Sequence, residues 1–209
     1  MLSAEGRRAR IAVFVSGGGT NLQALLDAQQ NGTLHSGEIV LVLSSNPGAY
    51  ALERARNAGV AAVTVSRKTA ASQEAFEAAI CAELDKAGID LIVLAGFMSI
   101  LSADFTSRYP ERILNVHPSL IPSFCGKGFY GLRVHEAALE KGVKVTGATV
   151  HFVNEIPDGG RILLQKAVEI LPDDTPEVLQ RRVMEQAEWL LLPQAAELVS
   201  AAIIGQGTV

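Results

Sequence analysis

Short apolar runs alternate with stretches of helical periodicity through the first half of the chain. The apolar runs are rich in Val, Ile and Leu, as buried strands are, and they occupy residues 11–15, 38–43, 61–65 and 90–95. Helices are expected between them, the first with Leu22, Leu25 and Leu26 on one stripe and the others over residues 50–57 and 72–87. The alternation predicts an α/β fold with a mostly parallel sheet and helices on both faces.

The second half has a different pattern, in which the elements are expected at residues 113–117 (strand), 118–131 (a Pro- and Gly-rich loop), 132–140 (helix), and 144–153 and 161–170 (strands). The last two strands are predicted to pair as an antiparallel hairpin, which gives the sheet an antiparallel C-terminal extension. A final helix starts at Thr175 and Pro176 and runs toward Leu198 with a kink at Pro193. No linker is visible, so residues 1–209 are expected to form a single domain with an ordered core at about residues 10–203.

Composition narrows the class of protein. The chain has 209 residues, of which 48% are hydrophobic, and a net charge of −4, so it has the material for a core and no basic field for nucleic acid or a membrane surface. No apolar run approaches the length of a membrane span. Two cysteines make no disulfide framework, and the four histidines lack metal-ligand spacing. A cytoplasmic protein without a metal is therefore expected.

A glycine-rich turn follows the first strand. The sequence Ser16-Gly17-Gly18-Gly19-Thr20-Asn21 leads into the first helix, where backbone N–H groups and the positive helix end favour an anion. The turn matches neither the dinucleotide-binding GxGxxG pattern nor a P-loop. It is either a phosphate site at Gly19, Thr20 and Asn21 or a tight turn that needs glycine for its geometry alone.

Three polar side chains form the candidate catalytic group. Asn115 and His117 are two residues apart on a strand, so both point to the same face of the sheet. Asp158, in a connection that ends in two glycines, is placed to return to the same crevice, with His151 as a further candidate partner. An amide and an imidazolium stabilise an oxyanion, and a carboxylate supports the imidazolium and moves protons, so the group suits amine attack on a carbonyl carbon. The alternative is a structural histidine at a strand end.

A covalent intermediate is not expected. No Ser or Cys lies in a nucleophile elbow, and Cys125 lies in a loop with no helix N-terminus beside it. Direct transfer between two bound substrates therefore suits the sequence better.

Four segments together resemble the folate-dependent formyltransferases, and among them the phosphoribosylglycinamide formyltransferases. They are SGGGTNLQ (16–23), AGFMSIL (95–101), NVHPSLIP (115–122) and GATVHFV (147–153) followed by DGG (158–160). The resemblance covers nearly the whole chain. It implies a Rossmann-like formyltransferase fold and transfer of the formyl group of 10-formyltetrahydrofolate, the co-substrate, to the amino group of glycinamide ribonucleotide in purine synthesis. The partners implied are these small molecules, with a monomer or a homodimer as the assembly.

The resemblance also implies roles for individual residues. His117 would be the general acid, Asn115 would hold the formyl oxygen, and Asp158 would tune His117 and carry the proton. The substrate, through its phosphate and ribose, would contact Gly19, Thr20, Asn21 and Glu188. The folate would contact Met98, Ser99, Ile100, Leu101, Asn115, Asn154, Glu155, Ile156, Pro157 and Asp158.

The chain departs from the family pattern at three places. The loop over residues 123–130 is longer than in the shorter members, and Gln73 stands where many members have an arginine that touches folate. The Glu-His pair of the last helix is matched by Glu188 and Trp189, of which Trp189 is expected in the core or at the flank of the site.

Three other functions share parts of the pattern. A methionyl-tRNA formyltransferase would be expected to carry a further basic C-terminal domain, and a formyltetrahydrofolate hydrolase a regulatory N-terminal domain. A phosphate-binding module without catalysis would leave Asn115, His117 and Asp158 scattered.

Overall fold

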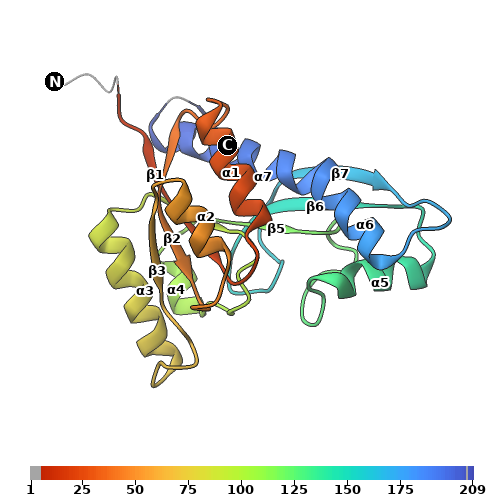
Figure 1. The fold of residues 1–209 in the computed structure, drawn as a ribbon, viewed down its shortest axis with the longest axis horizontal. Helices are drawn as coiled ribbons and strands as arrows, with labels where there is room; N and C mark the ends of the chain where they lie inside the picture. The colour runs from red at the N-terminus through yellow and green to blue at the C-terminus, as the bar shows by residue number, and fades with distance from the viewer. Residues whose placement is uncertain (1–5, 206) are drawn as a thin grey trace.

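One twisted sheet runs through the whole molecule (Figure 1). The computed structural model describes residues 6–205 and 207–209, and within them seven strands lie in the order β3-β2-β1-β4-β5-β6-β7. The strands are β1 (Ala9–Val15), β2 (Gly37–Ser44), β3 (Ala61–Thr64), β4 (Leu91–Leu94), β5 (Ile113–His117), β6 (Val145–Phe152) and β7 (Ile162–Glu169). Neighbours from β3 to β5 pair in parallel, whereas β5–β6 and β6–β7 pair antiparallel. The expected α/β fold, with its antiparallel extension, is confirmed.

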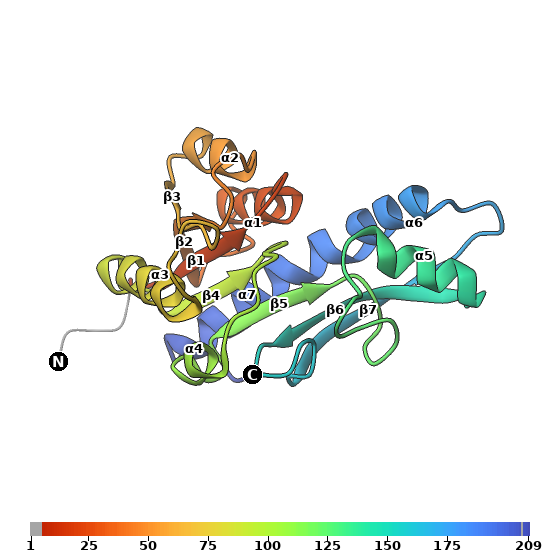
Figure 2. The ribbon, with the colours of Figure 1, turned by 90° about the horizontal axis from the view of Figure 1, so that it is seen from below.

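Helices cover both faces of this sheet. They are α1 (Thr20–Gln30), α2 (Ala51–Asn57), α3 (Gln73–Ala87), α4 (Ala103–Ser107), α5 (Leu132–Lys141), α6 (Pro176–Val183) and α7 (Trp189–Ile203). Along β1 the side chains alternate, so that Val13 packs in a core with residues of α1 and α7, and Phe14 in a second core with residues of α3 and α4. In both views α3 lies at the β3 end of the molecule and α5 at the β7 end (Figure 2).

The last helix differs from its expected form. A π-helical turn, η1 (Met184–Glu188), separates α6 from α7, and α7 continues through Pro193. The N–H group that proline lacks would have bonded to the carbonyl of Trp189, the first residue of α7, so the irregularity lies upstream of Pro193. Helix α4 was not expected, because its five residues are too few for a periodic pattern.

The register of β5 on β6 positions the candidate site. Asn115 lies directly opposite His151, and His117 directly opposite Thr149. Side chains that are opposite one another project to the same face, so both strands contribute to one polar surface. The expectation of a single domain over residues 1–209 stays a prediction, and its residues 1–5 and 206 lie outside the described residues.

Gly147 tests the packing of β6 against β7. A Cβ atom there would lie 2.0 Å from the backbone oxygen of Lys166. Gly147→Ala is expected to lower the free energy of unfolding by roughly 1–3 kcal/mol, because the strand must shift. The control is Gly48→Ala, where the nearest atom, Oδ1 of Asn46, would be 3.6 Å away. Equal urea midpoints for the two variants would contradict this packing.

Candidate active site

The carboxyl end of β5 carries the first two polar groups of the site. Asn115 and His117 alternate with Leu114 and Val116, which belong to the core beneath α1 and α7. The two polar side chains therefore point to the opposite face of the sheet, as their spacing predicts. His117 is buried, and its Nε2 lies 2.8 Å from the carbonyl oxygen of Phe124, so this nitrogen carries a proton and donates it.

Asp158 reaches the same place from the connection between β6 and β7. Its Oδ2 lies 3.6 Å from Nδ1 of His117, and its Oδ1 lies 3.6 Å from Nε2 of His151. The N–H of Gly126 donates a hydrogen bond of 2.8 Å to Oδ2. A φ of 55° at Asp158 lets the connection turn toward the sheet, a conformation that aspartate tolerates better than most residues. The structure thus brings Asn115, His117 and Asp158 together.

His151 orients the amide of Asn115. Its Nδ1 lies 2.8 Å from the carbonyl oxygen of Phe152 and so carries the proton. Its Nε2 accepts from Nδ2 of Asn115 at 3.1 Å. The second N–H of that amide is left to bind an oxygen in front of the strand.

The carboxyl of Asp158 is kept ionised. Burial acts to raise the pKa of Asp158, but the adjacent imidazole of His151, the charge of His117 and the N–H of Gly126 outweigh it and lower that pKa below its ordinary value. The neighbouring thiol behaves in the opposite way: burial, and then the charge of Asp158, raise the pKa of Cys125. A protonated thiol is a poor nucleophile, in agreement with direct transfer.

A pocket of about 160 Å³ opens beside these groups. Of the residues expected to contact folate, those that line it are Ser99, Ile100, Leu101, Asn115, Asn154, Glu155, Ile156, Pro157 and Asp158. Met98 is outside this set and 59% exposed. Gln73 is hydrogen-bonded to the backbone of this pocket's lining: its Nε2 donates to the carbonyl oxygen of Ile100 at 3.0 Å and to Glu77 at 2.7 Å. Gln73 therefore fixes the backbone of the pocket wall.

The glycine-rich turn ends at the N-terminus of α1. Gly19 has a φ of 74°, and a Cβ atom there would lie 2.6 Å from Cβ of Ala51, so glycine is required by conformation and by space. The first N–H groups of α1 have no partner within the helix, and such groups favour an anion. Arg54 of α2 lies beside them, its Nε donating to the carbonyl oxygen of Gly18 at 2.8 Å. Reasoning from the sequence missed this cation, because only the fold brings α2 beside the turn.

Glu188 lies next to this turn, at the end of η1. Nδ2 of Asn21 donates to its Oε2 at 2.7 Å, although the two residues are 167 positions apart. Burial raises the pKa of Glu188 to about 7, and the hydrogen bond from Asn21 opposes that rise. Among the described residues, Oδ1 of Asn21 is buried and has no hydrogen-bond partner.

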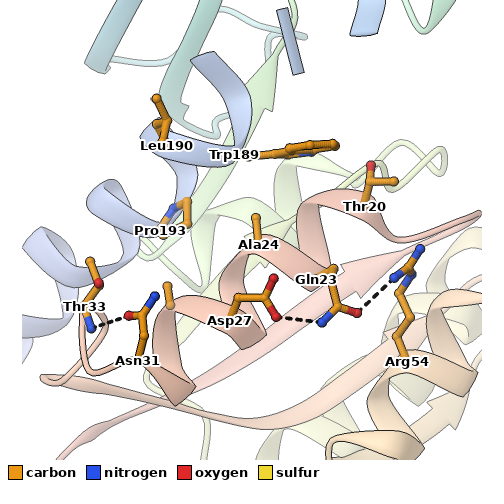
Figure 3. A pocket seen from close by; sticks show the side chains of 11 residues that line it. Thr20, Gln23, Ala24, Asp27, Asn31, Thr33, Arg54, Trp189, Leu190 and Pro193 are labelled. Carbon is orange, nitrogen blue, oxygen red and sulfur yellow. Dashed lines mark hydrogen bonds between the residues drawn. The ribbon is translucent and has the colours of Figure 1, made fainter. Parts of the chain in front are cut away.

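A groove of about 450 Å³ between α1 and α7 adjoins the turn (Figure 3). The ring of Trp189 extends from α7 toward Thr20, and Asp27, Gln23 and Arg54 form a hydrogen-bonded row along its lower side. Trp189 thus lies on the Thr20 side of the groove and forms part of its wall.

No group of three or more His, Cys, Asp or Glu side chains that could hold a metal ion occurs among residues 6–205 and 207–209. None of the helices in the described part of the chain is long and apolar enough to cross a membrane.

Comparison with known sequences decides the family. Residues 9–195 match the family described as formyl transferase. The chain belongs to the formyl transferase family. Among solved structures, this formyl transferase is similar to glycinamide ribonucleotide transformylase 1 from Symbiobacterium toebii, with 43% identity, a TM-score of 0.88, and coverage of 95% of this chain and 90% of that one. It is also similar to phosphoribosylglycinamide formyltransferase from Brucella melitensis, with 44% identity, a TM-score of 0.85, and coverage of 97% and 98%.

Two relatives are longer than this formyl transferase. The trifunctional purine biosynthetic protein adenosine-3 of Drosophila melanogaster is 43% identical over 200 residues, which are 95% of this chain and 14% of that protein. The chloroplastic phosphoribosylglycinamide formyltransferase of Arabidopsis thaliana is 40% identical over 185 residues, which are 88% of this chain and 63% of that protein. The chain therefore spans less than two thirds of either relative.

The buried carboxyl of Glu188 makes stability depend on pH. The folded-state pKa of about 7 lies above the ordinary value of 4.5, so the folded chain holds this proton more tightly than the unfolded chain. The contribution of the Glu188 proton to the free energy of unfolding is complete below about pH 4.5 and is lost as the pH rises through about 7. Glu188→Gln cannot ionise. As the pH is raised from 5 to 8, its free energy of unfolding is expected to rise by on the order of 2 kcal/mol relative to that of the wild type. Urea unfolding at both pH values measures it, and an unchanged difference between the two proteins would contradict the raised pKa.

Proposed function

We propose that this formyl transferase moves the formyl group of 10-formyltetrahydrofolate to the amino group of glycinamide ribonucleotide. The observation that carries the proposal is the meeting of Asn115, His117 and Asp158 between a mostly apolar pocket and an anion site. The chain spans more than two thirds of the length of the two solved relatives, and both relatives bear the names of enzymes of this reaction.

The pocket beside Asn115 suits a flat heterocycle such as the pterin of the folate. Its walls are mostly apolar, with Leu94, Phe97 and Val153 at the back and the backbone of residues 154–158 at the side. When bound there, 10-formyltetrahydrofolate supplies a formyl carbon attached to nitrogen, an acyl group open to attack by an amine. The pocket ends at Asn115 and Asp158, which places that carbon within reach of the polar groups.

The reaction breaks one bond and forms one. The substrate amine attacks the formyl carbon, a new C–N bond forms, and the bond from that carbon to the folate nitrogen breaks. Asn115 donates its free N–H to the formyl oxygen as negative charge develops there, and His117 in its charged form adds electrostatic support. Asp158 accepts the proton that the amine loses, and a proton passes to the folate nitrogen as it leaves, so charge and atoms balance.

The other end of the substrate is held by the turn before α1. The N–H groups of Gly19, Thr20 and Asn21 bind the phosphate, and the guanidinium of Arg54 adds positive charge beside them. Glu188, whose Oε2 accepts a hydrogen bond from Asn21, contacts the ribose end of the same substrate. The turn and the polar group lie at the same carboxyl edge of the parallel strands β1, β4 and β5, which favours transfer to a phosphorylated amine over simple hydrolysis of the formylfolate.

The remaining expectations accompany this proposal as predictions. The protein acts on small molecules as a monomer or a homodimer, in the cytoplasm, without a metal ion.

A spectrophotometric assay tests the function. Production of tetrahydrofolate from 10-formyltetrahydrofolate is followed with glycinamide ribonucleotide, with unphosphorylated glycinamide riboside, and with neither. Turnover that requires the ribonucleotide supports the proposal. Equal turnover without an amine identifies a hydrolase, and no turnover under any condition identifies a binding protein.

His117→Ala is expected to reduce kcat by about 10²- to 10⁴-fold, because the imidazole assists the chemical step. The dissociation constant of glycinamide ribonucleotide, measured by calorimetry, is expected to change little, since the anion site is separate. The matched control is His35→Ala, which removes an exposed imidazole paired with Glu197. A wild-type kcat in His117→Ala would show that the imidazole has no role in the chemistry.

A further inference from the structure

We propose that Gln165 of β7 is a positioning residue that holds His117 in its working orientation, acting through Thr149 and the loop over residues 118–124. The inference rests on the proposed function, since it concerns the same imidazole. Gln165 touches neither His117 nor the groups assigned to the substrates.

The three residues lie in one row across the antiparallel extension. His117 of β5 is directly opposite Thr149 of β6, and Thr149 is directly opposite Gln165 of β7. Directly opposed residues project to the same face, so the row runs from the exposed edge strand to the buried imidazole. Thr149 is completely buried, whereas Gln165 is exposed.

The hydroxyl of Thr149 is the centre of the network. Oγ1 donates to the carbonyl oxygen of Ser119 at 2.7 Å, accepts from the N–H of Ile121 at 3.1 Å, and accepts from Nε2 of Gln165 at 2.9 Å. One donor and two acceptor positions are the full capacity of a hydroxyl. Nε2 of Gln165 also donates to the carbonyl oxygen of Ile121 at 3.1 Å, so Gln165 uses both of its amide protons to hold the loop.

The loop passes this restraint on to the imidazole. The hydroxyl of Ser119 donates to the carbonyl oxygen of Ser123 at 2.5 Å, and contacts that of Phe124 at 3.5 Å. The Phe124 carbonyl then accepts the proton on Nε2 of His117. Two residues later, the N–H of Gly126 binds Asp158. The same short segment therefore sets both the orientation of the His117 ring and the place of its carboxylate partner.

This arrangement has a defined consequence for catalysis. With Nε2–H held by the Phe124 carbonyl, Nδ1 of His117 faces Asp158. If the loop is released, the imidazole is free to turn, and fewer molecules hold the charged His117 beside Asp158. Release of the loop therefore lowers the rate of the chemical step and leaves substrate binding in the pocket and at the anion site unchanged.

The experiment compares Gln165→Leu, which keeps the size of the side chain and removes its donors, with Lys166→Leu. Lys166 is the next residue of β7, is also exposed, and projects to the other face. Gln165→Leu is expected to lower kcat roughly 10-fold, about the rate equivalent of one hydrogen bond, with KM unchanged for both substrates. In the free protein, at a pH high enough for the His117 imidazole to be neutral, its ¹⁵N chemical shifts are expected to show less of the Nε2–H tautomer, the form that the Phe124 carbonyl favours. Lys166→Leu is expected to match the wild type in both measurements.

A pair of substitutions at Thr149 checks the route. Thr149→Ser keeps the hydroxyl and is expected to retain activity and tautomer, whereas Thr149→Val is expected to resemble Gln165→Leu. A wild-type kcat and tautomer in Gln165→Leu would overturn the inference, and so would a raised KM with kcat unchanged. Because the tautomer is measured without substrate, it decides on the positioning role even if the wild type fails to formylate glycinamide ribonucleotide.

Discussion

The antiparallel pairing of β6 with β5 is the constraint on which the site depends. It places His151 opposite Asn115 and Thr149 opposite His117, so each strand-end side chain of β5 has a polar neighbour on β6. A shift of β6 by one residue would turn His151 and Thr149 to the other face of the sheet, toward the apolar core that contains Leu114, and leave Asn115 and His117 without these neighbours. The same pairing carries the connection from β6 to β7 back across the site, where it delivers Asp158.

The site has two halves that come from different parts of the fold. The parallel half supplies the turn before α1, with a glycine that no other residue can replace without displacing Ala51. The antiparallel half supplies the amide, the imidazole and the carboxylate. Glu188 connects the halves, because the π-helical turn before α7 brings its buried carboxyl to Asn21 of α1. Local charge is therefore concentrated at two points of a mildly acidic protein, which suits a small anionic substrate.

Local pattern was sufficient to predict the strands, the main helices and the shared face of Asn115 and His117, because these follow from periods of 2 and 3.6 residues. The approach of Asp158 to His117 depends on how the nine-residue connection from β6 to β7 (153–161) folds, and the hydrophobic period of the flanking strands carries no information on that. Arg54 and Gln165 were missed for a related reason. Each has its role only through neighbours on other elements, and the rows across strands exist only once the register is known. The turn η1 and helix α4 are too short for periodicity to reveal.

A double-mutant cycle of His117→Ala and Asp158→Ala, measured as kcat of formyl transfer to glycinamide ribonucleotide, tests the central claim most directly. If the imidazole and the carboxylate act as one unit, removing the second group after the first costs little more, and the double variant is about as slow as the slower single variant. Rate losses that multiply independently would show that the two groups do not cooperate at one carbonyl carbon.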